Sequence, residues 1–135
     1  MKTRDIMTTK VITARPDETL KEVILKLRTN NISGVPIVNS NNKVVGVFSE
    51  TDVMKELPDL LNDADAIPLI DIKELTDTSV RMVMSEPKYI IAPDSEVKEA
   101  ARIMLEKYIH RLPVVENDEL VGIVSLGDVL KALSK

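Results

Sequence analysis

Two stretches of the chain repeat apolar residues at the spacing of an α-helix that is buried on one side. The intervals of three and four residues place these side chains along one helical face. We therefore predict two amphipathic helices, the second with the wider apolar stripe. Each follows a Pro-Asp pair, at Asp17 or Asp94, whose carboxylate can cap the helix. The apolar positions are Leu20, Val23, Ile24 and Leu27 in the first helix, and Val97, Ala100, Ala101, Met104, Leu105 and Tyr108 in the second.

Each helix is followed by two apolar runs of strand length. The first pair is "VPIV" (35–38) and "VVGVF" (44–48), and the second pair is "LPVV" (112–115) and "LVGIV" (120–124). The polar turns "NSNNK" and "ENDE" separate the runs. This pattern predicts two β-hairpins.

A further strand and a short helix complete each half of the chain. The opening strands are "KVITA" (10–14) and "KYIIA" (88–92), and the closing helices follow Ser49 and Ser125. Each half therefore has the predicted order strand, helix, strand, strand, helix.

The two halves are copies of one unit. An offset of 77 residues aligns the helices and the first hairpin strands, as from Pro16 to Pro93. After a shorter second turn, "VVGVFSETDVMKEL" aligns with "LVGIVSLGDVLKAL", and the opening "DIMT" echoes "MVMS". We predict a first repeat over 1–57, an acidic solvated linker over 58–79 with a helical turn near Leu60 and Leu61, and a second repeat over 80–135.

One repeat of fewer than 60 residues buries little apolar surface by itself, so the two repeats are expected to pack against each other. The predicted fold class is α+β, with two β-α-β-β-α repeats packed face to face about a pseudo-two-fold axis. A cleft is expected on either side of that axis.

Composition excludes several classes of protein. The net charge of -4 argues against a protein that mainly binds nucleic acid. No apolar run approaches the roughly 18–20 residues needed to span a bilayer, and the start of the chain does not resemble a secretory signal. The chain has no cysteine and one histidine, which leaves no metal cluster and no Ser-His-Asp or Cys-His arrangement. We expect a soluble, cytoplasmic protein that is not an enzyme.

Both repeats carry a Ser-x-x-Asp motif before the closing helix, Ser49 with Asp52 and Ser125 with Asp128. The simpler interpretation is a capping box, in which the serine side chain accepts from a backbone N–H and the carboxylate faces the positive end of the helix. The alternative is functional, since a carboxylate can accept hydrogen bonds from both hydroxyls of a ribose. The two roles are compatible.

The order of these motifs resembles a tandem pair of CBS domains, known as a Bateman module. The resemblance rests on "GVPIV" with "GVFSETD" and on "RLPVV" with "GIVSLGD", and it covers the chain apart from the linker. It implies a stand-alone regulatory protein that needs no cofactor and binds an adenosine-containing ligand, AMP, ADP or ATP, in the cleft between repeats. It also implies that the Ser-x-x-Asp motifs hold ribose. The expected partners are a second copy of the chain, through the "VKEAARIML" and "DVLKAL" helix faces, and an effector protein in trans, with no membrane or nucleic acid.

His110 and Arg111 precede the second Pro-Val strand and allow two interpretations. They follow a predicted helix, whose negative C-terminal end favours cations. Alternatively, "HRLPV" resembles the phosphate-binding segment of the gamma subunit of AMP-activated kinase, in which case Arg111 and His110 hold phosphate oxygens. The first repeat has Ser33 and Gly34 at these positions and lacks the charge. We therefore predict one stronger nucleotide site and one that is weaker or empty.

The adenine ring would need an apolar slot, although ordinary core packing also accounts for its candidate residues. These candidates are Val11, Ile12, Val47, Tyr89, Ile90 and Ile123. Two other hypotheses remain beside the nucleotide sensor. One is a sensor of S-adenosylmethionine or methylthioadenosine, and the other is a ligand-free interaction module whose Ser-x-x-Asp motifs are only caps.

Overall fold

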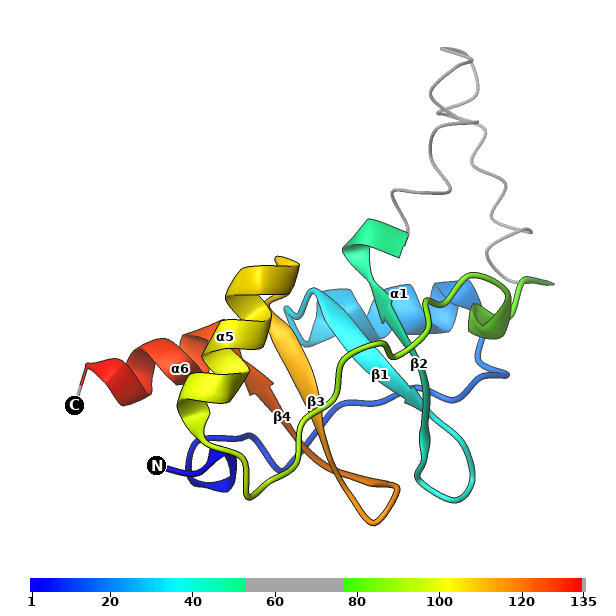
Figure 1. The fold of residues 1–135 in the computed structure, drawn as a ribbon. Coiled ribbons are helices and arrows are strands. Elements are labelled where there is room, and N and C mark those ends of the chain that lie inside the picture. The colour runs from blue at the N-terminus through cyan, green and yellow to red at the C-terminus, as the bar shows by residue number, and fades with distance from the viewer. Residues whose placement is uncertain (53–76, 135) are drawn as a thin grey trace. The chain divides into compact units, whose positions relative to one another are not determined.

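Both predicted hairpins are present, as two separate two-stranded sheets (Figure 1). The structure is a computed structural model that describes residues 1–52 and 77–134. Unit 1 consists of Met1–Val11, Ser40–Val44 and Pro87–Lys135, and unit 2 of Ile12–Asn39 and Val45–Glu86. The opening segment of the first repeat thus belongs to the unit that holds the hairpin of the second, and residues 80–86 belong to the unit that holds the hairpin of the first.

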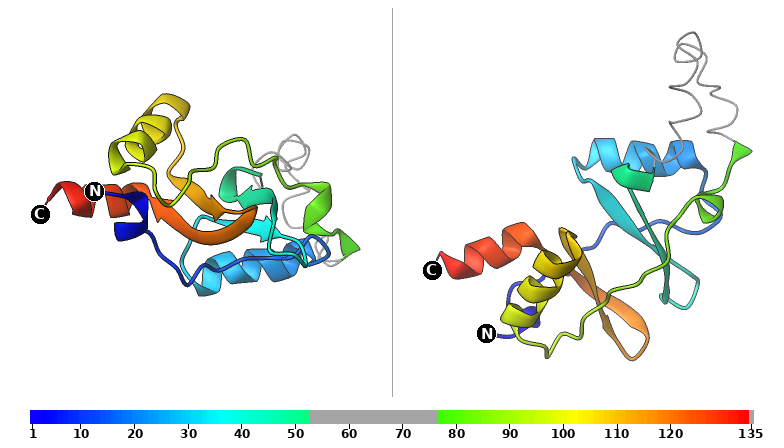
Figure 2. Two further views of the ribbon diagram at one scale, coloured as in Figure 1. Left: turned by 60° about the horizontal axis from the view of Figure 1, so that its bottom comes forward. Right: turned by 45° about the horizontal axis from the view of Figure 1, so that its top comes forward.

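Among its described residues, unit 1 contains a short 3-10 helix (Thr3–Asp5), two α-helices and an antiparallel hairpin. The α-helices are α5 (Val97–Lys107) and α6 (Leu126–Leu133), and the strands are β3 (Arg111–Glu116) and β4 (Glu119–Ser125). The strands are joined by Asn117 and Asp118, which both have positive φ, 53° and 65°, as a tight hairpin turn requires. Figure 2 shows α5 and α6 alongside this hairpin.

Unit 2 repeats this plan. Helix α1 (Leu20–Thr29) precedes β1 (Gly34–Val38) and β2 (Val44–Ser49), which pair in a second two-stranded sheet. A helix begins at Glu50–Asp52, and its predicted continuation lies outside the described residues, as does the linker up to residue 76. The four predicted hairpin strands and the two long helices are therefore confirmed, and the fold class is the expected α+β.

A segment from the other repeat pairs with the outer edge of each hairpin. In unit 1, Thr8 pairs with Ile123 of β4 through two backbone hydrogen bonds of 2.8 and 2.9 Å. In unit 2, Ser85 pairs in the same way with Val47 of β2, at 2.9 and 2.9 Å. The echo of "DIMT" in "MVMS" therefore marks two equivalent edge segments, residues 1–8 and 78–85, each of which pairs with the hairpin of the other repeat.

The predicted opening strands are wrong as strands. Residues 10–14 and 88–92 each form a single parallel bridge, Ala14 to Ile37 and Ile91 to Val114. Proline explains why pairing stops there. The next bonds of the ladder toward the N-terminus would need a backbone N–H from the proline of β1 or β3, and the next toward the C-terminus one from Pro16 or Pro93.

The predicted aspartate caps are also wrong. Helix α1 begins after Thr19, whose hydroxyl accepts from the Glu22 N–H at 3.2 Å, and α5 begins after Glu96 without a side-chain cap. The first N–H of each helix donates to an edge segment, from Leu20 to the Thr78 carbonyl at 2.9 Å and from Val97 to the Met1 carbonyl at 3.1 Å. These backbone bonds do part of the work that a capping side chain would otherwise do.

The edge segments also complete the two cores. Val80 is fully buried in unit 2 beside Val23, Ile37 and Phe48. Thr3 is fully buried in unit 1, and its hydroxyl donates to the Ser95 carbonyl at 2.8 Å. Each core therefore includes a side chain that is contributed by the other repeat.

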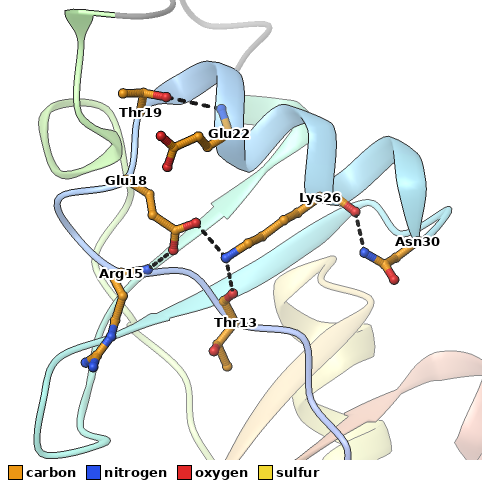
Figure 3. Close-up of polar contacts among 7 residues, drawn as sticks. All are labelled: Thr13, Arg15, Glu18, Thr19, Glu22, Lys26 and Asn30. Atoms are coloured by element: carbon orange, nitrogen blue, oxygen red, sulfur yellow. Dashed lines mark hydrogen bonds and ion pairs between the residues drawn. The ribbon is translucent and has the colours of Figure 1, made fainter.

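An ion pair fixes the start of unit 2 to α1 (Figure 3). The Lys26 ammonium lies 2.6 Å from a Glu18 carboxylate oxygen and donates to the Thr13 carbonyl at 2.9 Å. The other Glu18 oxygen accepts from the Arg15 N–H at 2.5 Å. The second repeat has Ser95 and Ile103 at the positions of Glu18 and Lys26, so this arrangement is specific to unit 2.

We expect Lys26→Met to lower the free energy of unfolding by about 1 kcal/mol, because the pair is only partly exposed and the lysine also satisfies a carbonyl. Urea unfolding measures the change. Lys21→Met removes an exposed lysine from the same helix and is the control, with an expected change within about 0.5 kcal/mol. Equal losses in the two variants would contradict a structural role for the ion pair.

Candidate functional site

The second Ser-x-x-Asp motif is a capping box at the start of α6. The Ser125 hydroxyl accepts from the Asp128 N–H at 3.1 Å, and one Asp128 oxygen, Oδ2, accepts from the Ser125 N–H at 2.9 Å. The capping interpretation of this motif is therefore confirmed. The other carboxylate oxygen, Oδ1, accepts no hydrogen bond within the part of the chain that the structure describes.

His110 and Arg111 lie next to this capping box. Arg111 is the first residue of β3 and faces Ser125, the last residue of β4, across the hairpin. The His110 carbonyl accepts from the Leu126 N–H at 2.8 Å, which fixes the segment against the first turn of α6. The imidazole is exposed and the arginine half-buried. Unit 1 therefore gathers two basic side chains, a hydroxyl and a carboxylate at one end of its hairpin.

His110 and Arg111 lie farther from the end of α5 than the helix-end interpretation expects. Helix α5 ends at Lys107, and Tyr108 follows in the left-handed conformation at φ 55°. His110 and Arg111 thus lie beyond the last turn, where the field of the helix has already fallen off. The Tyr108 side chain is 91% exposed, and a positive φ is uncommon for such a bulky residue.

The first Ser-x-x-Asp motif has a similar backbone but a more enclosed carboxylate. The Ser49 N–H and hydroxyl donate to Asp52 Oδ2 at 2.9 and 3.3 Å. The Ser33 carbonyl accepts from the Glu50 N–H at 2.9 Å, as the His110 carbonyl does in unit 1. Ser33 is exposed and Gly34 half-buried, so this end of the hairpin carries no basic residue at the aligned positions.

Ser85 is a contact of Asp52 that the sequence reasoning missed. Its hydroxyl donates to Asp52 Oδ1 at 2.5 Å, and Asp52 is 4% exposed. The only sequence signal was the echo of "DIMT" in "MVMS", which places Thr8 at the position equivalent to Ser85.

The candidate residues for an adenine slot are divided between the units. Ile12 and Val47 belong to unit 2, and the other four to unit 1. Within unit 1, Ile123 lies on β4 beside Thr8, whereas Tyr89 and Ile90 lead into Ile91 on the far edge of β3. The Tyr89 ring lies 5.6 Å from the Lys107 ammonium. Unit 1 therefore does not bring Tyr89 or Ile90 beside Ile123. The fourth candidate in this unit, Val11, follows Thr8 by three residues.

A separate groove of about 650 Å³ lies on the helical face of unit 1. Helices α5 and α6 form its apolar walls, and Met1 also lines it. None of the candidate ligand-binding residues takes part. The apolar lining is Met1, Val97, Ala101, Leu105, Val129, Ala132 and Leu133.

The family of the chain follows from comparison with known proteins. The CBS domain matches residues 4–59 and again residues 80–135. The chain belongs to the CBS-domain family. The two matches cover both hairpins and both Ser-x-x-Asp motifs of this tandem CBS protein.

The chain is similar to one uncharacterized protein and to two proteins of known structure. An uncharacterized protein of Methanocaldococcus jannaschii is 35% identical over 96% of this chain and 89% of its own length. CBSX2 of Arabidopsis thaliana, solved in complex with AMP, is 26% identical, with a TM-score of 0.80 over 98% of this chain and 96% of that one. The structure of another M. jannaschii protein, proposed as an archaeal homologue of the γ subunit of AMP-activated kinase, is 29% identical, with a TM-score of 0.85 over 98% of this chain and 47% of that one.

Within residues 1–52 and 77–134, no group of three or more His, Cys, Asp and Glu side chains could hold a metal ion. Nor does that part of the CBS pair contain a helix with the length and hydropathy needed to cross a bilayer.

Proposed function

We propose that this CBS pair is a regulatory sensor of adenine nucleotides, AMP, ADP or ATP, that signals to a partner protein in trans and catalyses no reaction. The observation that carries the proposal is the group of side chains at the end of the unit 1 hairpin. There a carboxylate oxygen of Asp128 lies at the same hairpin end as the basic residues His110 and Arg111. The AMP complex of CBSX2, a protein of the same fold, supports this choice of ligand.

Each of these groups suits one part of a nucleotide. Asp128 Oδ1 can accept a ribose hydroxyl while Oδ2 keeps the capping bond to the Ser125 N–H. The Arg111 guanidinium offers a planar pair of donors to phosphate oxygens, and the His110 ring can donate one more hydrogen bond. An adenosyl ligand without phosphate, such as methylthioadenosine, would use the carboxylate but not the arginine.

A thermal-shift series with AMP, ADP, ATP, S-adenosylmethionine and methylthioadenosine tests the proposal. A ligand that binds only the folded protein stabilises it by about 2.7 kcal/mol at 100 times its Kd. We expect this gain with a phosphorylated nucleotide and expect Arg111→Ala to lose most of it. The matched control is Arg28→Ala, an exposed arginine on α1 in unit 2, which should keep the full gain.

The other outcomes favour the other two hypotheses. If methylthioadenosine stabilises both wild type and Arg111→Ala, the ligand is an adenosyl compound without phosphate. If no compound changes the melting temperature, the chain is a ligand-free interaction module and both Ser-x-x-Asp motifs are only helix caps.

The proposed partner of the unit 1 groove is a second copy of the chain. Leu105 and Leu133 at this groove are 71% and 74% exposed, and exposed apolar side chains that gather at one surface are typical of a protein–protein contact. Its charged lining consists of two acids, Glu96 and Glu106, and two bases, Lys98 and Arg102. A neutral lining of mixed sign suits a two-fold contact with an identical surface, in which each acid can face a base.

A further inference from the structure

The two equivalent Ser-x-x-Asp carboxylates differ in how much hydrogen-bonding capacity they retain. In both units, Oδ2 of the aspartate accepts from the backbone N–H of the serine at 2.9 Å. The difference lies at Oδ1. In unit 2 this oxygen of Asp52 accepts from the Ser85 hydroxyl at 2.5 Å. In unit 1 the same oxygen of Asp128 accepts nothing from the described residues.

Residues at equivalent positions cause this difference. Ser85 and Thr8 occupy the same place in the two edge segments, and each pairs through two backbone bonds with the adjacent strand. Because the backbone pairing is the same, the difference arises from the side chains. Thr8 is exposed, and its hydroxyl makes no hydrogen bond within residues 1–52 and 77–134.

The Ser85 hydroxyl donates to Oδ1 of Asp52 the same kind of hydrogen bond that a ribose hydroxyl of a nucleotide would donate. Ribose presents hydroxyl groups to a carboxylate, and the Ser85 hydroxyl is a donor of the same kind at hydrogen-bonding distance. Asp52 is 4% exposed and accepts from Ser49 as well, so a ribose would have to displace Ser85 to reach it. Hydrogen bonds to charged groups are strong enough that such a displacement weakens binding on the order of 10- to 100-fold.

We propose that Ser85 takes the place of a ligand hydroxyl on Asp52, so that Asp52 is closed to ribose and Asp128 is the carboxylate that binds nucleotide. This inference rests on the proposed function, which it deepens by assigning unequal roles to the two motifs. It also adds to the difference in charge, since the closed carboxylate lies in the unit with Ser33 and Gly34 where unit 1 has His110 and Arg111.

Isothermal titration with AMP tests the assignment in the full chain. Wild type should bind about one equivalent. Asp128→Asn should weaken that binding at least about 10-fold, because the neutral amide is a poorer acceptor for ribose, whereas Asp52→Asn should leave it unchanged. In both variants the asparagine oxygen can still accept the serine N–H, so the helix caps are retained.

Opening the closed carboxylate is the complementary experiment. Ser85→Ala should raise the affinity of a second AMP site by about 10-fold or more, and adding Asp52→Asn should remove that site again. Thr8→Ala, at the equivalent position, should leave the titration unchanged. If Ser85→Ala does not fold, as circular dichroism would reveal, the comparison of Asp52→Asn with Asp128→Asn still decides.

The possible results separate the inference from the proposed function. The inference alone is overturned if wild type binds AMP and Asp52→Asn weakens binding as much as Asp128→Asn, or if wild type binds two equivalents with equal affinity. If neither wild type nor Ser85→Ala binds AMP, both the proposed function and the inference are wrong. If only Ser85→Ala binds, Ser85 does close Asp52, but the assignment of nucleotide to Asp128 is wrong, and so is the proposed sensing by the wild-type chain.

Discussion

Replacing Gly122 with alanine is expected to lower the free energy of unfolding by about 3 kcal/mol. A Cβ at this position of β4 would lie 2.6 Å from the Met7 sulfur and 3.0 Å from the Thr8 carbonyl oxygen. The sulfur can rotate away, but the carbonyl cannot, because it accepts the Ile123 N–H at 2.9 Å. Overpacking against fixed backbone typically costs about 1–3 kcal/mol, and this site belongs at the upper end. Urea unfolding measures the loss.

Gly127 provides the matched control, because the same substitution should have the opposite sign there. Gly127 is exposed in α6, and a Cβ would meet only the Ser125 hydroxyl oxygen at 3.6 Å, an ordinary contact. Alanine should therefore stabilise the chain by up to about 1 kcal/mol through its higher helix propensity. If Gly122→Ala proved as harmless as Gly127→Ala, the segment with Met7 and Thr8 would not be held against β4.

The same close approach occurs in unit 2 and explains why both repeats carry a glycine in the second hairpin strand. A Cβ at Gly46 would clash with the Met84 sulfur. In each unit, a methionine from the edge segment thus covers the glycine while the next residue pairs with the strand. The methionines of the Met-Thr and Met-Ser pairs therefore make contacts between distant segments. Met7 and Gly122 are 115 residues apart in the sequence, and Gly46 and Met84 are 38 apart.

The sequence predicted the local features of the fold and missed the ones that depend on distant segments. Periodicity was enough for α1, α5 and the hairpin strands, because those elements are determined by residues within them. The Pro-Asp pair predicts a cap of α1 at Asp17, and nothing in the sequence indicates that Leu20 donates to Thr78 instead. The opening strands failed because pairing also depends on the prolines of the neighbouring strand.

The candidate site likewise contains local contacts that the sequence predicts and a distant contact that it does not. The spacing of Ser125 and Asp128 was enough to predict a capping box, because that contact lies within one helical turn. The repeat alignment indicated that Ser33 and Gly34 replace His110 and Arg111, and this also needs no tertiary information. The Ser85 contact with Asp52 joins residues 33 positions apart, and no local pattern predicts which hydroxyl reaches that carboxylate. The adenine slot remains a prediction, since its candidates are spread over both units.

The paired substitution Leu105→Glu and Leu133→Glu is expected to dissociate the proposed homodimer. The apolar stripe predicted on α5 is wider than the part that the core buries: Val97 and Ala100 are buried, whereas Leu105 is 71% exposed. Leu133 of α6 is 74% exposed at the same groove. In a two-fold contact each copy would contribute a carboxylate at both positions, and all of these carboxylates would have to be desolvated. We expect the dimer Kd to rise on the order of 100-fold or more.

Sedimentation equilibrium across a concentration series measures that change. Leu25→Glu is the matched control, because Leu25 is a 51% exposed leucine on α1, the equivalent helix of unit 2, and does not line the groove. It should leave the dimer intact, and circular dichroism should confirm that all variants are folded. A monomeric wild type, or equal dissociation by Leu25→Glu, would rule out the groove as the dimer contact. Dissociation by the paired substitution alone would place the contact at the groove of α5 and α6, whose lining includes none of His110, Arg111 and Asp128, so that nucleotide and second copy could be bound together.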